Sequence, residues 1–282
     1  MLDEAYERLG ASGFELPNGF VNHGPMACEA LAFLDFDDDV DVWASRFAQA
    51  GTAVEPTPPG RFEWQEALGD YRRLPEWLGY FDEAIDVDGW AAVVEVWVPR
   101  LLPGLVVALF HGEIRTAHAV RSVSITDTPP RRAELARALG YWAARYQEGR
   151  PAHEPPEEIA DVRPAVIVAA ADGARHYLAH PSIFDLHGVT GAMALEILID
   201  HIPSPAAAAG LAQLRAEHEA LYRDTAVARP APAGADDSRL AHAAVSSGDP
   251  HQVKLVEACR RGWQATGDLA FAAAAECVTG LP

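Results

Sequence analysis

Apolar side chains at helical spacing constrain this chain more than any other feature of its sequence. Over residues 74–86 and 129–147 they recur at i, i+3, i+4 and i+7, which is the spacing of one helix face. Further helices are expected over residues 37–51, 183–202, 206–222, 238–244, 250–262 and 269–277. Neither an alternating strand pattern nor a solenoid repeat occurs. The sequence therefore predicts a mainly α, single-domain fold that resembles a helical bundle.

The most apolar part of the chain lies between residues 90 and 121. Charged residues and prolines interrupt the stretch 90–111, so it falls short of the roughly 18 apolar residues that a membrane-spanning helix needs. Residues 103–121 are apolar nearly all round, which is typical of a helix buried at the centre of a fold. For residues 162–171, periodicity does not choose between a strand and a helix.

Two stretches are expected to be surface connections. Residues near 149–160 are rich in proline and glutamate, and residues 226–237 form a Pro/Ala/Gly linker without core-forming side chains. We therefore expect one domain, residues 1–282, from which both linkers protrude. A domain boundary near 150–160 is the alternative.

The charge of the chain argues against several functions. With 41 acidic against 22 basic residues the formal net charge is −19, and such a chain repels nucleic acid and anionic lipid, so neither is an expected partner. The 3 cysteines are far apart and include no CxxC pair, which fits a reducing compartment and argues against a zinc cluster. The acidic N-terminal segment does not resemble a signal peptide. We expect a cytoplasmic protein, whose oligomeric state the sequence does not indicate.

A single lysine stands out among the basic residues. All of the 22 basic residues are arginines except Lys254. Arginine stays charged, whereas a lysine amine can lose its proton on burial and then act as a nucleophile or be modified. Fingerprints such as GxGxxG, the P-loop, GxSxG and HExxH do not occur. Lys254 is therefore a candidate functional residue. The alternative is that one lysine remains by chance in a composition that favours arginine.

Histidines embedded in apolar helical sequence are the other candidates. His23 stands just before Pro25, which suits the first position of a helix. His111 and His118 leave the same face of their predicted helix, roughly 10.5 Å apart along its axis. Arg115 lies between them and is the candidate catalytic residue, as a group that contacts a metal ligand or a substrate anion.

Two further histidines complete the set. His187 lies in an apolar segment beside small residues, and His251 shares a helix face with Lys254. Each histidine taken alone is explained as well by helix capping or core packing. Together with the single lysine they predict a mononuclear metal site inside a helical core. Imidazole ligands without thiolate suit Fe, Zn, Cu or Ni.

Four segments, in this order, resemble the blocks of the questin oxidase-like family. They are NHGPMACEAL, LFHGEIRTAHAVR, FDLHGVTGAMAL and GDPHQVKLVEAC, which span Asn22 to Cys259. The resemblance implies a largely helical, non-haem iron oxygenase that acts on aromatic polyketides such as anthraquinones. The expected reaction is ring cleavage or Baeyer-Villiger-type oxygen insertion, with O2 as co-substrate and NADPH as a candidate reductant.

The resemblance also implies a set of ligands for Fe(II), namely several histidines and a carboxylated lysine. The implied metal ligands are His23, His111, His118 and His187, with His251 as a ligand or a neighbour and Lys254 as a carbamate formed with CO2. Carbamate formation needs a neutral amine, which burial near a cationic metal site favours.

Two other functions remain open from the sequence. One is a metal-dependent hydrolase, because helical, histidine-rich sites also activate water. The His-Asp doublet of one common helical phosphohydrolase type is absent, which disfavours this alternative. The other is a non-catalytic binding protein for an aromatic metabolite, whose pocket would be lined from the 7 Trp and 10 Phe residues.

Overall fold

The structure is a computed structural model that describes residues 1–16, 18–49, 51–58, 60, 62–152, 161–223, 226–228, 234 and 236–281. Within these residues the chain forms 14 α-helices and no strand. An isolated bridge joins Glu15 and Val21. The predicted mainly α fold is therefore confirmed.

The helices have well-defined bounds along the chain. The α-helices are α1 (Leu2–Gly10), α2 (Gly24–Phe33), α3 (Asp37–Phe47), α4 (Trp64–Ala67), α5 (Leu74–Asp88), α6 (Trp90–Leu101), α7 (His111–Ile125), α8 (Pro129–Arg145), α9 (Arg163–Ala179), α10 (Ile183–Leu198), α11 (Ser204–Leu221), α12 (Asp237–Ser247), α13 (Pro250–Thr266) and α14 (Leu269–Thr279). The 3₁₀ helices are η1 (Tyr71–Arg73), η2 (Leu102–Gly104) and η3 (Ile199–His201). Most of the ambiguous stretch 162–171 belongs to α9, which settles its type as helix.

The helix expected over residues 103–121 is wrong in its first half, because α7 begins only at His111. The three residues before it, Ala108–Phe110, adopt left-handed φ angles of 50°, 57° and 63°. This conformation costs roughly 1–2 kcal/mol per non-glycine residue. Phe110 is buried against α10, where a Cβ atom on Gly191 would lie 2.6 Å from its ring. Tertiary packing of Phe110 therefore stabilises a turn that the local sequence disfavours.

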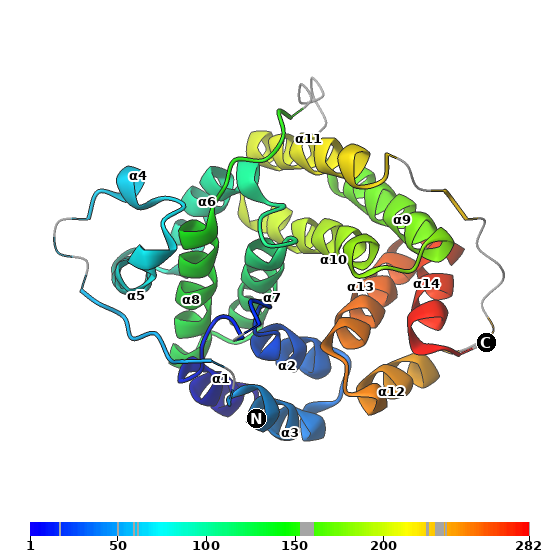
Figure 1. The fold of residues 1–282 in the computed structure, drawn as a ribbon, viewed down its shortest axis with the longest axis horizontal. Helices are drawn as coiled ribbons and strands as arrows, with labels where there is room; N and C mark the ends of the chain where they lie inside the picture. Colours follow the sequence, from blue (N-terminus) through cyan, green and yellow to red (C-terminus); the bar gives the residue numbers. More distant parts are fainter. Residues whose placement is uncertain are drawn as a thin grey trace.

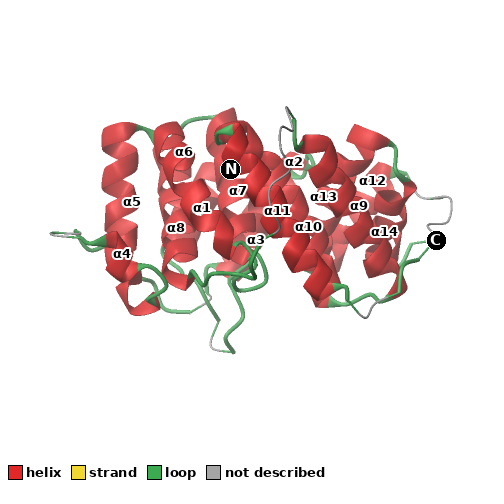
Figure 2. Cartoon of the chain, turned by 90° about the horizontal axis from the view of Figure 1, so that it is seen from above, coloured by secondary structure: helices red, strands yellow, loops and turns green. Residues whose placement is uncertain are grey.

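Four helices, α2, α7, α10 and α13, form a closed ring at the centre of the molecule (Figure 1). Helix α2 contacts α7 and α13, and α10 contacts the same two helices. Other helices cover this ring from outside: α1 and α3 contact α2, α8 contacts α7, α9 and α11 contact α10, and α12 and α14 contact α13. Figure 2 shows the described chain as helices and loops alone, seen from above.

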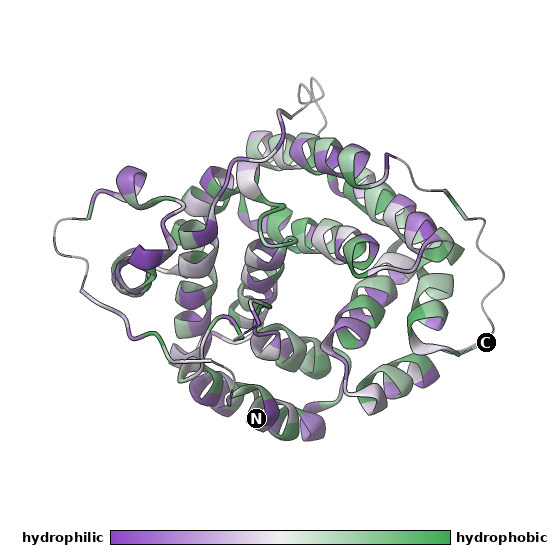
Figure 3. Cartoon of the chain, viewed as in Figure 1, coloured by the Kyte–Doolittle hydropathy of each residue, from purple (hydrophilic) through white to green (hydrophobic). Residues whose placement is uncertain are grey.

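Burial follows this two-layer arrangement. Residues 111–123 of the inner helix α7 are all buried, whereas the outer helix α12 buries only Leu240, Ala241 and Ala244, which lie on one face. Hydropathy along the chain agrees in part: the inner helix α2 is mostly apolar and the outer helix α8 carries both hydrophilic and hydrophobic residues, although the outer helix α14 is also mostly apolar (Figure 3). The inner ring is thus the structural core, and its four helices are the elements that position the candidate site.

Some expectations fall on parts of the chain that are not described. Residues 153–160 of the first expected linker, and residues 229–233 and 235 of the second, lie outside the described residues. Within the described part, no helix combines the length and the apolar character that crossing a membrane requires.

Candidate metal centre

The N-terminal ends of the four inner helices meet at one point, and each contributes a histidine. His23 is the N-cap of α2, His111 is the first residue of α7, His251 is the second of α13, and His187 is the fifth of α10. The ring centroids are 4.7 Å apart for His23 and His111, 4.6 Å for His111 and His187, 5.5 Å for His187 and His251, and 4.5 Å for His251 and His23. Four segments distant in sequence therefore bring their imidazoles into one circle.

Three of these imidazoles direct ligand atoms at one another. Ligand atoms of His23, His111 and His187 all lie within 4.8 Å of one another, and all three residues are buried. Nε2 of His111 is 2.9 Å from Nε2 of His23 and 3.2 Å from Nε2 of His187. Two nitrogen ligands on one metal ion lie about 3.0 Å apart at right angles and about 3.4 Å apart in a tetrahedron. The observed spacings match those of neighbouring ligands.

Backbone carbonyls set the orientation of two of the rings. Nδ1–H of His111 donates to the carbonyl of Ala108, and Nδ1–H of His187 donates to the carbonyl of Ile183 at 2.6 Å. A neutral imidazole carries a proton on only one nitrogen. Both Nε2 atoms therefore present lone pairs to each other, which is the tautomer that metal-binding histidines adopt when a carbonyl holds the opposite nitrogen.

Burial keeps these imidazoles neutral. Burial, together with the nearby Lys254 amine, lowers the pKa of His111 to about 3. Burial followed by the same amine also holds the pKa values of His23 and His187 well below their ordinary value. A proton therefore does not relieve the repulsion between the two lone pairs, whereas a shared metal ion does. The donor set fits a transition metal that accepts imidazole ligands.

His251 belongs to the circle of rings but not to the three converging ligands. Its Nδ1 lies 3.0 Å from the Oδ1 atom of Asp249, which also accepts a hydrogen bond from the backbone N–H of His251 at 2.9 Å. The side chain of His251 is 21% exposed, whereas those of the other three are buried. The structure thus places His251 as a neighbour of the cluster on its solvent side.

Lys254 lies one helical turn after His251 and is only 1% exposed. Its Nζ atom has no hydrogen-bond partner among the described residues. Burial lowers the pKa of Lys254 to about 7, against the raising effect of Asp249. The site therefore holds a buried primary amine, a substantial fraction of which is neutral near pH 7, and this amine affects the pKa values of the three histidines.

Arg115 and His118 have partners elsewhere. Arg115 donates to both carboxylate oxygens of Glu134, at 2.7 and 2.9 Å, and His118 Nδ1 lies 2.5 Å from an oxygen of Glu29. The rise along α7 explains this difference, because seven residues carry His118 about 10.5 Å away from His111. The structure therefore does not bring the expected ligand His118, or the expected catalytic Arg115, to the three-histidine cluster.

Several groups that shape the cluster escaped the sequence reasoning. Asp249 could have been found from the sequence, because an Asp followed by Pro is typical of an N-cap and the first residue of a helix. The carbonyls of Ala108 and Ile183 had no such signal, since any residue supplies a carbonyl.

Glu113 is 0% exposed, and its carboxyl oxygens have no hydrogen-bond partner among the described residues. Burial raises the pKa of Glu113 well above its ordinary value, which favours the neutral form of this carboxyl group.

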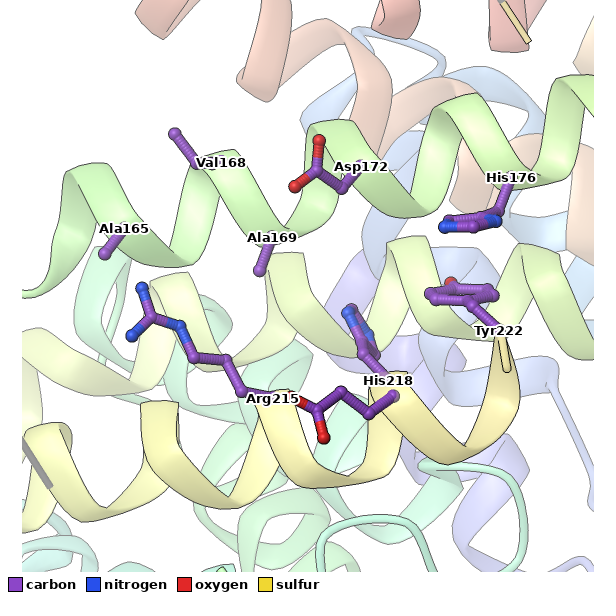
Figure 4. Close-up of a pocket in the computed structure, with 9 residues that line it drawn as sticks. Ala165, Val168, Ala169, Asp172, His176, Arg215, His218 and Tyr222 are labelled. Carbon is purple, nitrogen blue, oxygen red and sulfur yellow. The ribbon is translucent and has the colours of Figure 1, made fainter. Parts of the chain in front are cut away.

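One pocket is lined by His218, which contacts the carbonyl of Gly188, the residue after His187. It measures about 380 Å³, lies between α9 and α11, and presents His218 beside the stacked rings of His176 and Tyr222 (Figure 4). Nε2–H of His218 donates to the carbonyl of Gly188 at 3.1 Å, and burial lowers the pKa of His218 to about 4. This pocket is therefore separated from the cluster by the backbone of α10.

A second pocket lies beside the segments that precede His23 and His111. It measures about 400 Å³, and its walls include Val21 and Ala108, which stand two and three residues before those ligands. Tyr141 also lines it. We call this cavity the flanking pocket.

Neither a comparison with protein-family models nor one with curated proteins found a match. The questin oxidase-like resemblance therefore stays a prediction from four segments. Those segments do meet in the structure, because their histidines form the circle described above.

Proposed function

We propose that this protein is a non-haem, iron-dependent oxygenase of the cytoplasm, acting on a hydrophobic aromatic substrate of the anthraquinone or polyketide type. One observation carries the metal site: the Nε2 atoms of His111 and His187 lie 3.2 Å apart with both Nδ1 atoms bound to carbonyls. A shared cation makes this arrangement favourable for neutral rings. Iron and oxygenase chemistry are supported by the resemblance of the four histidine-bearing segments.

Each residue of the cluster has a role in this proposal. His23, His111 and His187 hold Fe(II), and His251 borders the open side. The neutral amine of Lys254 attacks CO2, which forms a nitrogen–carbon bond and releases a proton. The resulting carbamate supplies an anionic oxygen, which offsets the charge of a metal ion among neutral imidazoles. Bound iron supplies the capacity to activate O2.

The flanking pocket is the proposed substrate site. Its volume of about 400 Å³ lies within the range of about 300–1,000 Å³ typical of small-molecule pockets. Val21 and Ala108 provide apolar contacts, and Tyr141 provides an aromatic ring. Glu15 and Arg145, which form an ion pair at 2.5 Å, supply polar groups for the oxygen atoms of a phenolic ligand.

Two reaction types are distinguished by their oxygen balance. Ring cleavage places both atoms of O2 in the product and needs no external reductant. Baeyer-Villiger-type insertion places one atom in the product and releases the other as water, which takes a hydride from NADPH and a second proton from solvent. Oxygen and NADPH consumption, measured per product formed, therefore decide between the two reactions.

Metal analysis of purified wild-type protein beside a Lys254→Arg variant tests the proposal. We expect iron in the wild type, a carbamate signal in the carbon NMR spectrum after incubation with labelled bicarbonate, and loss of that signal in the variant. Oxygen uptake is measured with a hydroxyanthraquinone as probe. A wild type without transition metal, together with a variant that oxidises the probe equally well, would falsify the proposal. Turnover without oxygen uptake indicates a hydrolase instead, and ligand binding without turnover indicates a binding protein.

A further inference from the structure

A chain of buried ion pairs crosses the four inner helices below the histidine cluster. Arg121 of α7 contacts both carboxylate oxygens of Glu29 on α2, with Nε to Oε1 at 2.7 Å, and it also donates to Glu257 on α13. His118 adds a contact to the same Glu29. Glu29, Arg121 and Glu257 are 3%, 8% and 1% exposed. A single guanidinium thus joins three of the four helices.

The chain continues to the fourth inner helix. Arg261 of α13 donates to Glu257 at 2.6 Å, to the carboxylate of Glu196 on α10 at 2.5 Å, and to the carbonyl of Met193 on α10 at 3.0 Å. Glu29, His118, Arg121, Glu257, Arg261 and Glu196 together are called the ion-pair chain. Every helix that carries a cluster histidine therefore also carries a member of this chain.

The members follow the cluster histidines by six to ten residues along their helices, which is about 9 to 15 Å. Glu29 follows His23 by six residues, and Glu257 follows His251 by six. At 1.5 Å per residue, these offsets are about 9 Å along each helix. His118 lies one turn before Arg121 on α7. The ion-pair chain is therefore separate from the histidine cluster and contains none of the three converging ligands.

The buried carboxylates of the ion-pair chain are paired with cationic side chains, and these pairs constrain the relative positions of the helices. Although burial alone would raise it, Arg121 and His118 hold the pKa of Glu29 below its ordinary value. Arg121 and Arg261 do the same for the pKa of Glu257. An arginine fork on a carboxylate has a preferred planar geometry, so a shift of one helix by one residue breaks it. Small apolar side chains, such as those along α10, tolerate such shifts more easily.

We infer that Arg121 and Glu257 are positioning residues that hold α2, α7 and α13 in register, and so set the spacing of the histidine Nε2 atoms. The inference rests on the proposed metal site. Metal sites tolerate errors of only about 0.2 Å in ligand distance, which is far less than the 1.5 Å rise of one residue. Loss of the register therefore weakens metal binding even when the protein stays folded.

The chain offers a matched control. Arg115 and Glu134 form an equally buried pair, with side chains 3% and 2% exposed, joined by two hydrogen bonds. This pair ties α7 to α8, which carries no cluster histidine. Glu134→Gln and Glu257→Gln therefore remove the same charge from comparable surroundings, and only Glu257 belongs to the ion-pair chain.

The test titrates metal-free wild type, Glu257→Gln and Glu134→Gln with cobalt(II) in competition with a chelator. Thermal unfolding of each metal-free protein is recorded beside it, and the visible cobalt spectrum reports ligand geometry. We expect both variants to lose stability, but only Glu257→Gln to bind cobalt about tenfold more weakly and with an altered spectrum. Arg121→Lys, which keeps the charge but loses the fork, should show the same weakening.

Two results overturn the inference in distinguishable ways. Equal cobalt affinities and spectra for Glu257→Gln and Glu134→Gln leave the metal site intact and assign the ion-pair chain to stability alone. A wild type that binds no cobalt removes the proposed metal site, and the positioning role with it. If Glu257→Gln does not fold, Arg121→Lys is compared with Arg115→Lys under the same criteria.

Discussion

His111 and His187 face each other through Nε2 atoms 3.2 Å apart, while Nδ1–H of each ring donates to a backbone carbonyl. The carbonyls come from Ala108, in the turn before α7, and from Ile183, the first residue of α10. Backbone geometry therefore decides which imidazole nitrogen is free. The free nitrogens of the two neutral rings are left in a contact that a shared cation makes favourable.

Replacing His187 by alanine should abolish metal-dependent stabilisation. A ligand that binds only the folded state raises the unfolding temperature, so the wild type should be stabilised by added metal. We expect His187→Ala to lose this shift and to bind metal more than about a hundredfold more weakly. Thermal unfolding with and without iron(II) or cobalt(II) measures both effects.

His218→Gln serves as the control for this experiment. His218 is also buried and donates to the carbonyl of Gly188, but it lies behind α10 rather than in the cluster. The glutamine keeps a donor, so the metal-induced shift should persist. A wild-type-like shift in His187→Ala, or its loss in His218→Gln, contradicts the assignment of ligands.

The buried amine of Lys254 should make the metal-free protein less stable near neutral pH than at alkaline pH. Its pKa is lowered to about 7 in the folded state, while the unfolded chain keeps the ordinary value of 10.5. Between these values the unfolded state binds more protons, so this contribution to stability rises with pH and levels off above the unfolded pKa. From about pH 7 to about pH 9 the gain is about 2 kcal/mol.

A Lys254→Met variant isolates this contribution. It removes the titrating group but keeps much of the buried volume, so it should stabilise the metal-free protein most near pH 7. The advantage over the wild type should shrink by about 2 kcal/mol towards pH 9. Urea denaturation of both proteins at the two pH values measures the difference. An advantage that does not depend on pH means that the amine is not neutralised by burial.

Replacing Gly191 by alanine should destabilise the protein, although alanine favours a helix. A Cβ atom at this position would lie 2.6 Å from the ring of Phe110, which closes the left-handed turn before His111. Overpacking of this kind costs about 1–3 kcal/mol. Gly10→Ala in α1, where a Cβ atom has no neighbour within 4 Å, is the control and should be neutral or stabilising. Chemical denaturation compares the two, and equal effects would refute the close contact.

Glycine at position 108 should stabilise the protein. Ala108 has a φ angle of 50°, and removing its Cβ atom relieves about 1 kcal/mol of strain. The carbonyl that accepts from His111 remains, so metal affinity should not change. Ala209→Gly, on the exposed face of α11, should instead cost about 1 kcal/mol. A loss of stability at both positions shows that the turn is not strained.

The sequence predicted most helices because amphipathic spacing is a local property. It failed at the turn 105–110, where an apolar pattern suits a buried helix and a buried turn equally well. Only the contact of Phe110 with Gly191 on α10, far away in sequence, decides between them. The type of residues 162–171 was open for the same reason.

The candidate site residues show the same division between what the sequence predicts and what the tertiary structure decides. Sequence alone nominated His23, His111, His187, His251 and Lys254, because these residue types are unusual in apolar or arginine-rich surroundings. It also nominated His118 and Arg115, because they share a helix face with His111. A shared face does not show how far apart residues lie along the helix axis. Tertiary structure decided that helix starts, rather than helix faces, meet at the cluster. In the structure His118 and Arg115 form buried ion pairs instead, and the Lys254 amine has no hydrogen-bond partner among the described residues.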